Sequence, residues 1–191
     1  MSARLDNLIS CFTGLQALLD STYPMMLACM DHEEIGSETH VGAGGTFLEE
    51  TLQRLAGENY ATLMRRSLMV SCDNAHAQHP NFPTKHESEH APLLNGGVVV
   101  KINSNQRYAT SARTQGRFVQ CARVLHVPTQ TFVTRSDMGC GSTIGPITAT
   151  RLGIETIDVG VPQLAMHSIR ELAGTKDAYG LYRILMQLGD F

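Results

Sequence analysis

Short apolar runs alternate along the chain with segments whose apolar residues recur at three- and four-residue steps. The runs have the continuous apolar character of parallel strands, and the periodic segments are typical of amphipathic helices. The pattern predicts strands at residues 25–30, 67–72, 98–102, 130–134 and 156–161. It predicts helices at residues 5–19, 47–55, 111–125, 145–152 and 176–188, with Gly57 as the C-cap of the second.

Strand and helix alternation of this kind predicts an α/β fold in which a largely parallel sheet is sandwiched by helices. A length of 191 residues fits one domain that is large enough to bury a real core. Residues 73–97 interrupt the alternation with a long polar stretch that is rich in histidine and proline. Irregular segments of that length are uncommon in compact domains and are often functional.

Composition argues against several kinds of partner. A net charge of −3 gives no electrostatic reason to expect nucleic acid or an anionic membrane. The longest apolar stretches, such as residues 25–30, are too short to span a bilayer, and no apolar signal region follows the first residues. The five cysteines include no Cys-x-x-Cys pair, which favours buried free thiols over disulfides or a zinc knot. We therefore expect a cytoplasmic protein without nucleic-acid or membrane partners.

Polar clusters stand where the predicted strands end. Residues 31–34, with the sequence Asp-His-Glu-Glu, follow one strand, and residues 73–76, with the sequence Asp-Asn-Ala-His, follow the next. Residues 162–167 follow a third strand and end at His167, while Asp6 lies at the start of the first helix. Binding sites of open α/β sheets form beyond the carboxyl ends of the strands. Acids and a histidine at several such ends predict a metal site.

The chemistry of these side chains fits a hydrolytic zinc site. Hydrolysis of a peptide bond near neutral pH needs an activated water, a base for its proton and a Lewis acid for the carbonyl oxygen. Zinc binds histidine nitrogen and carboxylate oxygen, and paired zinc ions lie roughly 3.5 Å apart. The adjacent Glu33 and Glu34 point in different directions, so that one can bind metal while the other acts as the base.

Each of these residues also has a purely structural interpretation. Asp6 could be the N-cap of the first helix, and Asp73 could cap a turn. The pair Glu33 and Glu34 could belong to a solvated loop or to the start of a helix. A single histidine such as His167 is more often a hydrogen-bonded surface or core residue than a metal ligand. The residues alone leave these alternatives open.

A glycine-rich loop occupies residues 137–145 and includes Gly141. It lacks the lysine of a phosphate-binding loop, which argues against a nucleotide site. We expect it to let the backbone approach a substrate closely, with the amides of the following helix facing a carbonyl or carboxylate.

Six blocks of the sequence together resemble the M18 family of metallopeptidases, the aspartyl aminopeptidase group. The blocks are residues 4–7 (RLDN), 31–37 (DHEEIGS), 73–81 (DNAHAQHPN), 101–109 (KINSNQRYA), 140–146 (CGSTIGP) and 162–171 (PQLAMHSIRE). Each block is weak alone, but the set extends nearly from one end of the chain to the other. The resemblance implies a zinc-exopeptidase fold of the phosphorylase/hydrolase-like type.

The resemblance implies a role for each polar residue at the strand ends. Asp6 resembles the carboxylate that bridges two zinc ions, and Glu33 resembles the general base. Glu34 and His167 resemble the ligands that share one zinc, while Asp73 resembles the terminal ligand of the other. The implied cofactor is zinc, two ions for each complete site, with Mn²⁺ and Co²⁺ as substitutes.

The resemblance also suggests where a substrate would bind. Lys101 is the position that we expect to contact an acidic substrate side chain, and the alternative is a surface lysine on a strand. His76 is a candidate for a substrate-binding group or for a group that supports the metal ligands. Tyr108 and Gly141 complete the candidate substrate site.

The implied function is removal of one N-terminal residue, in many cases Asp or Glu, from peptides. A water activated by the two zinc ions would attack the carbonyl carbon, and Glu33 would move its proton to the leaving amine. Related enzymes differ in the pocket for that residue, so an aminopeptidase for neutral residues is an alternative. Members of the family assemble as dimers that build dodecamers, which implies a homo-oligomer.

One departure from the family limits these implications. No histidine in the chain matches the ligand that completes the second zinc site, and the upstream strands and inserted dimerisation domain are absent. We therefore expect residues 1–191 to form the C-terminal portion of a catalytic domain that is truncated at the N-terminus. A fragment without catalytic activity is the second alternative.

Overall fold

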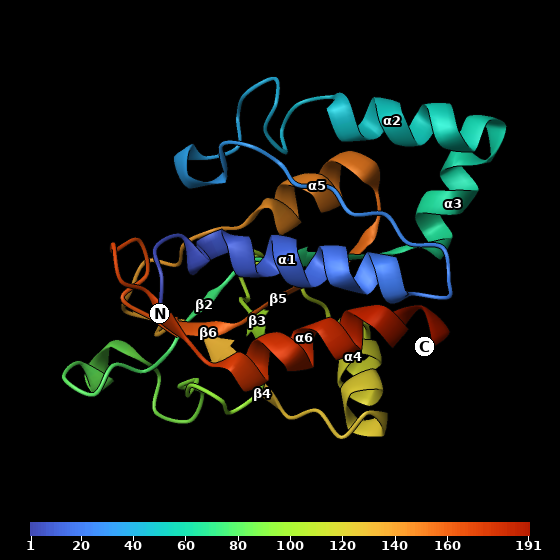
Figure 1. Ribbon diagram of the computed structural model, residues 1–191. Helices are drawn as coiled ribbons and strands as arrows, with labels where there is room; N and C mark the ends of the chain where they lie inside the picture. The colour runs from blue at the N-terminus through green and yellow to red at the C-terminus, as the bar shows by residue number, and fades with distance from the viewer.

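The computed structural model describes residues 1–191 and shows an α/β fold (Figure 1). The α-helices are α1 (Leu5–Asp20), α2 (Phe47–Ala56), α3 (Tyr60–Arg66), α4 (Ala112–Val124), α5 (Ile144–Leu152) and α6 (Thr175–Gln187). The strands are β1 (Leu68–Cys72), β2 (Ala75–His76), β3 (Val98–Ile102), β4 (Thr129–Val133), β5 (Glu155–Gly160), β6 (Pro162–Leu164) and β7 (Leu172–Ala173). Short 3₁₀ turns are η1 (Glu33–Ile35), η2 (Gly57–Asn59), η3 (Pro83–Lys85) and η4 (Leu188–Asp190).

The main sheet has the strand order β1-β5-β3-β4. Its pairs β1–β5 and β3–β4 are parallel, whereas β3 and β5 are antiparallel where they meet in the middle. A largely parallel sheet is therefore confirmed, but the two parallel pairs run in opposite directions. The carboxyl ends of β1 and β5 consequently lie together at one end of the strands, and those of β3 and β4 lie together at the opposite end.

A small second sheet, ordered β2-β6-β7, continues the β1–β5 pair. Strands β2 and β6 are parallel, as β1 and β5 are. Two backbone hydrogen bonds connect the pairing of β1 with β5 to that of β2 with β6. Asp73 N–H donates to Val159 O at 3.0 Å, and Ala75 N–H donates to Val161 O at 3.0 Å. Asp73 is thereby fixed at the junction of the two sheets.

Helices cover both faces of the main sheet. One core joins alternate side chains of β3 and β5 to α1, α4 and α6, and α1 lies alongside α6 (Figure 1). Its fully buried members include Val98, Val100, Phe118, Ile157, Val159, Leu181 and Ile184. Helix α5 packs against β5 and β1. Burying each large side chain of this kind contributes about 1.5–3 kcal/mol.

One predicted strand is wrong. Residues 25–30 form no sheet, and Met26 and Cys29 are exposed. The segment packs by side chains instead, with Leu27 against Gly14 of α1. An apolar run forms a strand only when its N–H and C=O groups pair with a neighbouring strand, and here they do not pair with β1, the edge strand of the sheet.

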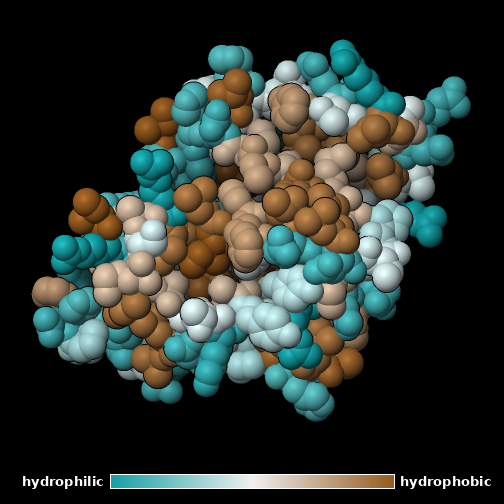
Figure 2. Space-filling model, viewed as in Figure 1, coloured by the Kyte–Doolittle hydropathy of each residue, from teal (hydrophilic) through white to brown (hydrophobic).

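The first helix is confirmed, but four of its large apolar side chains do not face the core. Residues on the buried side are small or polar, namely Ser10, Thr13, Gly14 and Ala17. The exposed large side chains are Leu8, Phe12, Leu15 and Leu19, which are 57%, 64%, 45% and 69% exposed. Figure 2 shows apolar side chains gathered on this face of the molecule. The amphipathic pattern of α1 therefore marks an apolar face that nothing in this chain covers.

The remaining predicted helices and strands are confirmed within one or two residues. Gly57 caps α2 with a φ of 53°, and Ser111 caps α4 through its side chain. Helix α3 and the second sheet were not predicted, because both consist of short elements without a clear period. All five cysteines are free. None of the helices combines the length and the apolar character that a membrane span requires.

Two glycine substitutions test how tightly the sheet junction is packed. A Cβ at Gly160 would overlap the backbone carbonyl of Asp73, whereas a Cβ at Gly116, an exposed position within α4, would meet no atom within 4 Å. We expect Gly160→Ala to lower the free energy of unfolding by about 1–3 kcal/mol through overpacking. Gly116→Ala should raise it by about 0.5–1 kcal/mol, because alanine is the better helix former. Urea denaturation measures both, and a wild-type stability for Gly160→Ala would contradict this packing.

Candidate metal centre

Three side chains from distant parts of the chain meet beyond the carboxyl ends of β1 and β5. Asp6 comes from the start of α1, Glu34 from η1 and His167 from the loop between β6 and β7. His167 Nε2 lies 3.1 Å from Asp6 Oδ2 and 3.1 Å from Glu34 Oε2. Ligand atoms of the three residues all lie within 4.8 Å of one another. The structure thus brings together three of the four residues that the sequence marked as metal ligands.

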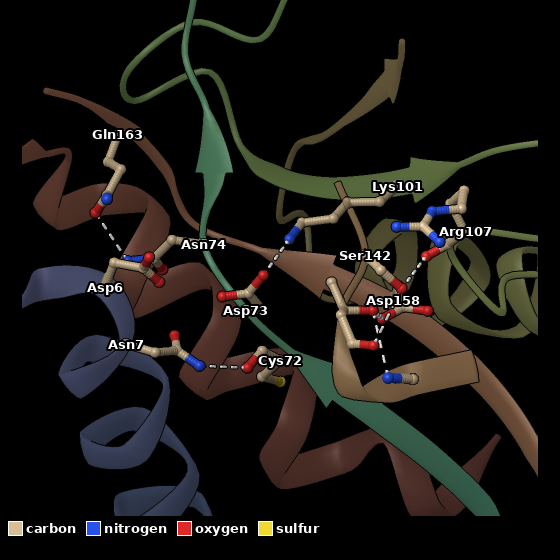
Figure 3. A network of polar contacts seen from close by, with 12 residues as sticks. Asp6, Asn7, Cys72, Asp73, Asn74, Lys101, Arg107, Ser142, Asp158 and Gln163 are labelled. Atoms are coloured by element: carbon tan, nitrogen blue, oxygen red, sulfur yellow. Dashed lines mark hydrogen bonds and ion pairs between the residues drawn. The ribbon is translucent and has the colours of Figure 1, made fainter. Parts of the chain in front are cut away.

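Asp6 is held in place by two asparagines around the end of β1. Asn7 Nδ2 donates to Cys72 O at 2.7 Å (Figure 3), and Asn74 Nδ2 donates to Leu5 O at 2.8 Å. Asn74 also donates to Gln163 Oε1 at 2.9 Å. These bonds fasten the start of α1 to both sheets. Neither asparagine was identified from the sequence as a functional residue.

The Asp6 carboxylate is not the N-cap of α1. The N-cap residue is Arg4, and no side chain caps the helix. The Asp6 side chain is only 4% exposed, and its Oδ1 atom is buried without a hydrogen-bond partner. A buried carboxylate oxygen without a partner is costly unless a cation or a donor meets it. The N-cap alternative is therefore excluded, and Asp6 has an oxygen free for a further interaction.

The other two side chains of the group are open to solvent. The side chains of His167 and Glu34 are 60% and 56% exposed, in contrast to that of Asp6. The site is accordingly buried on the side of Asp6 and accessible on the opposite side. Catalytic zinc sites have this character, because one coordination position must remain available to water or substrate.

Glu33 lies beside this group but outside it. It is partly buried, and burial, followed by the negative charges of Asp73 and Glu34, raises its pKa to about 7. Burial and the neighbouring carboxylates of Asp73 and Glu34 likewise raise the pKa of Asp6 to about 7. Carboxylates in such proximity either share protons or bind a cation.

Asp73, the fourth predicted ligand, is paired with a lysine instead of with His167. Lys101 Nζ, which comes from β3, lies 3.0 Å from Asp73 Oδ2 (Figure 3). The Lys101 side chain is only 3% exposed, so the alternative of a surface lysine is wrong. This buried ammonium offsets part of the negative charge that gathers at the strand ends.

The other three substrate-site candidates lie in different surroundings. Tyr108 is buried, and its ring centroid lies 5.5 Å from Lys101 Nζ. His76 is exposed in β2, and its backbone oxygen lies 3.1 Å from His86 Nε2. Gly141 is exposed, and a Cβ there would meet no atom within 4 Å. The chain's own packing therefore does not require glycine at position 141, and space remains open beside it.

A buried carboxylate in β5 anchors two loops that the sequence marked for substrate. Asp158 Oδ1 accepts from Thr143 Oγ1 at 2.6 Å, and Asp158 Oδ2 accepts from Ala109 N–H at 2.6 Å. These bonds fix the glycine-rich loop and the loop after β3 to the main sheet (Figure 3). Asp158 was not singled out from the sequence, although an acid in the middle of an apolar strand is a recognisable signal.

The donor set of the three clustered residues suits zinc. Two carboxylates and one imidazole are ordinary zinc ligands, and three protein ligands with an open side are typical of catalytic sites. The unpartnered Oδ1 of Asp6 provides one more oxygen for a cation. The residues present therefore fit a zinc ion.

Comparisons with known proteins identify the family of the chain. Residues 1–188 match the family described as "Aminopeptidase I zinc metalloprotease (M18)". The chain is 57% identical over 187 residues to a "Probable M18 family aminopeptidase 2" of Stutzerimonas stutzeri, covering 96% of this chain and 44% of that protein. The chain thus spans less than half the length of the relatives that it matches.

Solved structures show the same fold. A chain in the cryo-EM structure of the Ape4 and Nbr1 complex is 41% identical with a TM-score of 0.91, covering 100% of this chain and 39% of that chain. The S. cerevisiae mApe1 dodecamer is 29% identical with a TM-score of 0.84, covering 99% and 47%. The match to the family extends over nearly the whole sequence, and this chain therefore belongs to the M18 family of zinc aminopeptidases.

Proposed function

We propose that this chain provides a zinc-binding part of an aminopeptidase active site, which removes the N-terminal residue of peptides. The observation that carries the proposal is the convergence of Asp6, Glu34 and His167, whose ligand atoms lie within 4.8 Å of one another. These residues come from three separate segments of the fold. Membership of the M18 family supports zinc as the metal and peptides as substrates.

Two zinc ions in the complete site would divide the carboxylates between them. In this proposal Asp6 would help to hold both ions, Glu34 and His167 would hold the first with it, and Asp73 would hold the second. Support comes from the free Oδ1 of Asp6 and from the Asp73 carboxylate, which raises the pKa of Asp6. The second site then has only two ligands from this chain. A further ligand must come from other polypeptide, and without it this chain is the inactive fragment considered above.

Zinc bound at these residues would supply the Lewis acid that polarises the substrate carbonyl and makes water more acidic. The chain's own residues would do the rest. Glu33, beside the ligand group, would accept a proton from the attacking water and donate it to the leaving amine. A partly buried carboxyl with a pKa raised to about 7 suits a group that both accepts and releases a proton near neutral pH.

A preference for acidic N-terminal residues is the finer proposal, and Lys101 would be its source. Lys101 is a buried cation at the site, and Tyr108 lies under its ammonium group. Its charge is paired with Asp73 at 3.0 Å. A cation bound by Asp73 would compete for that carboxylate and free the ammonium for an acidic substrate. If the pair stays intact, the alternative of neutral substrates is favoured.

A homo-oligomer is proposed for the complete protein, because the solved structures that match include a dodecamer. The exposed apolar face of α1 would be costly to leave in water, which agrees with coverage by other polypeptide. The five free cysteines agree with a cytoplasmic, reducing environment.

Zinc titration of the isolated chain tests the metal centre. We expect fewer than two equivalents of zinc to bind, because only one complete set of three ligands is present. His167→Gln should weaken that binding by at least tenfold, since it removes the only nitrogen ligand. His40→Gln is the matched control, because His40 is exposed and lies outside the group. Equal zinc affinity in the two variants, measured by competition with a chelating dye, would reject this site.

The role of Glu33 is testable in a chimera in which this chain replaces the matching segment of the Stutzerimonas stutzeri relative. We expect Glu33→Gln to retain zinc but to lower kcat by about 10²–10⁴-fold, because glutamine cannot accept the proton. Glu38→Gln, at an exposed position of the same loop, should leave kcat unchanged. A near-normal kcat for Glu33→Gln would assign the base to another residue.

The same chimera tests the proposed preference for acidic residues. Lys101→Met should lower the ratio of kcat/KM for an N-terminal Asp substrate to that for a Leu substrate by about tenfold or more, since it removes a charge-assisted contact. Lys85→Met, at an exposed position, should not change the ratio. If Lys101→Met leaves the ratio unaltered, Lys101 only pairs with Asp73 and does not contact the substrate.

A further inference from the structure

Glu171 is a buried carboxylate whose two oxygens accept hydrogen bonds from the backbones of two metal-ligand residues. Its Oε2 accepts from Asp6 N–H at 3.0 Å, and its Oε1 accepts from His167 N–H at 2.6 Å. The residue is 1% exposed, and no lysine, arginine or histidine pairs with it. A buried carboxylate satisfied only by backbone N–H groups forms strong, charge-assisted bonds with a fixed geometry.

The backbone of Glu171 joins the same two regions. Ser2 N–H donates to Glu171 O at 3.0 Å, and Glu171 N–H donates to Ser2 O at 2.9 Å. The start of the chain is therefore bonded to the loop after β6 by main chain and side chain together. Asp6 and His167 are 161 positions apart in the sequence, so their separation depends on such long-range bonds.

The backbone N–H groups of Asp6 and His167 do not take part in the regular hydrogen bonding of a helix or a sheet. His167 has a φ of 67°, in the left-handed region that residues other than glycine seldom adopt. Asp6 has φ and ψ of −86° and 107°, which are not helical although α1 has begun. Their N–H groups thus need an acceptor outside the usual secondary structure, and Glu171 provides it for both.

We propose that Glu171 is a positioning residue that sets the distance between Asp6 and His167 as ligands of one zinc ion. It acts through the two backbones and does not touch the metal. The inference rests on the proposed metal centre. Residues that orient metal ligands typically change metal affinity by about 10–100-fold when they are replaced.

Asp177 offers a matched control. It is also 1% exposed, and it accepts from two backbone N–H groups, those of Asn95 at 2.6 Å and Gly97 at 2.8 Å. It lies in the first turn of α6 and bonds to no residue of the metal centre. Glu171→Gln and Asp177→Asn each replace a buried carboxylate by its amide and each place an NH₂ group against a backbone donor.

The experiment compares zinc affinity, by competition with a chelating dye, in the wild-type chain and these two variants. Both variants should lower the urea midpoint, because both disturb a pair of buried hydrogen bonds. Only Glu171→Gln should weaken zinc binding, by about tenfold or more. The visible absorption of bound Co²⁺, which reports ligand geometry, should likewise change only in Glu171→Gln.

Several outcomes would overturn the proposal. Unchanged zinc affinity and an unchanged Co²⁺ spectrum in Glu171→Gln would reject the positioning role alone, and equal weakening in Asp177→Asn would reduce it to general stability. A wild-type chain that binds no zinc would reject the metal centre and this inference with it.

If Glu171→Gln does not fold, hydrogen exchange of the wild-type chain tests the role of Glu171 instead. The backbone amides of Asp6 and His167 should then be protected from exchange. Exchange as fast as that of exposed loop amides would refute their hydrogen bonds to Glu171.

Discussion

The parallel pairing of β1 with β5, continued by β2 with β6, is the constraint on which the site depends. It brings the ends of β1 and β5 together beside Asp73, and β6 then leads to the loop that carries His167. Asn7 and Asn74 then fasten the start of α1 to the carboxyl end of β1 and place Asp6 beside it. A shift of this pairing by one residue would turn the side chains of the shifted strand to the opposite faces of the sheet.

Crowded negative charge is the second organising element. Several carboxyl groups share the edge, and burial with mutual repulsion raises the pKa of Asp6 and that of Glu33 to about 7. Lys101 is the buried cation that offsets part of this charge through Asp73. Folding thus brings negative charges together at a cost in free energy. A bound divalent cation would offset that cost, which is the physical reason to regard the cluster as a candidate metal centre.

Much of this arrangement could be predicted from the sequence, because periodicity and strand-end chemistry are local signals. All five predicted helices and four of the five predicted strands follow from such signals. The meeting of Glu34 with Asp6 and His167 follows from the family resemblance instead, because no strand precedes residues 31–34. Pairing partners are not local, and so the apolar residues 25–30 were assigned to a strand that does not form. The antiparallel contact of β3 with β5 was missed for the same reason.

The positions of individual side chains were harder to predict than the elements. The burial of Lys101 depends on Asp73, the acid that follows β1 and pairs with it, which the sequence of β3 does not reveal. The exposed apolar row on α1 was visible as a pattern, but a pattern does not say whether this chain or another polypeptide covers it. Periodicity fixes which side chains share a face, whereas the contacts of that face depend on the rest of the fold.

The most direct test of the central claim is anomalous diffraction at the zinc absorption edge from crystals of this chain grown with zinc. The structure predicts one strong peak about 2.0–2.2 Å from an Asp6 oxygen, a Glu34 oxygen and a ring nitrogen of His167. A peak only elsewhere, for instance among the histidines of residues 76–90, would contradict the assignment of the metal centre.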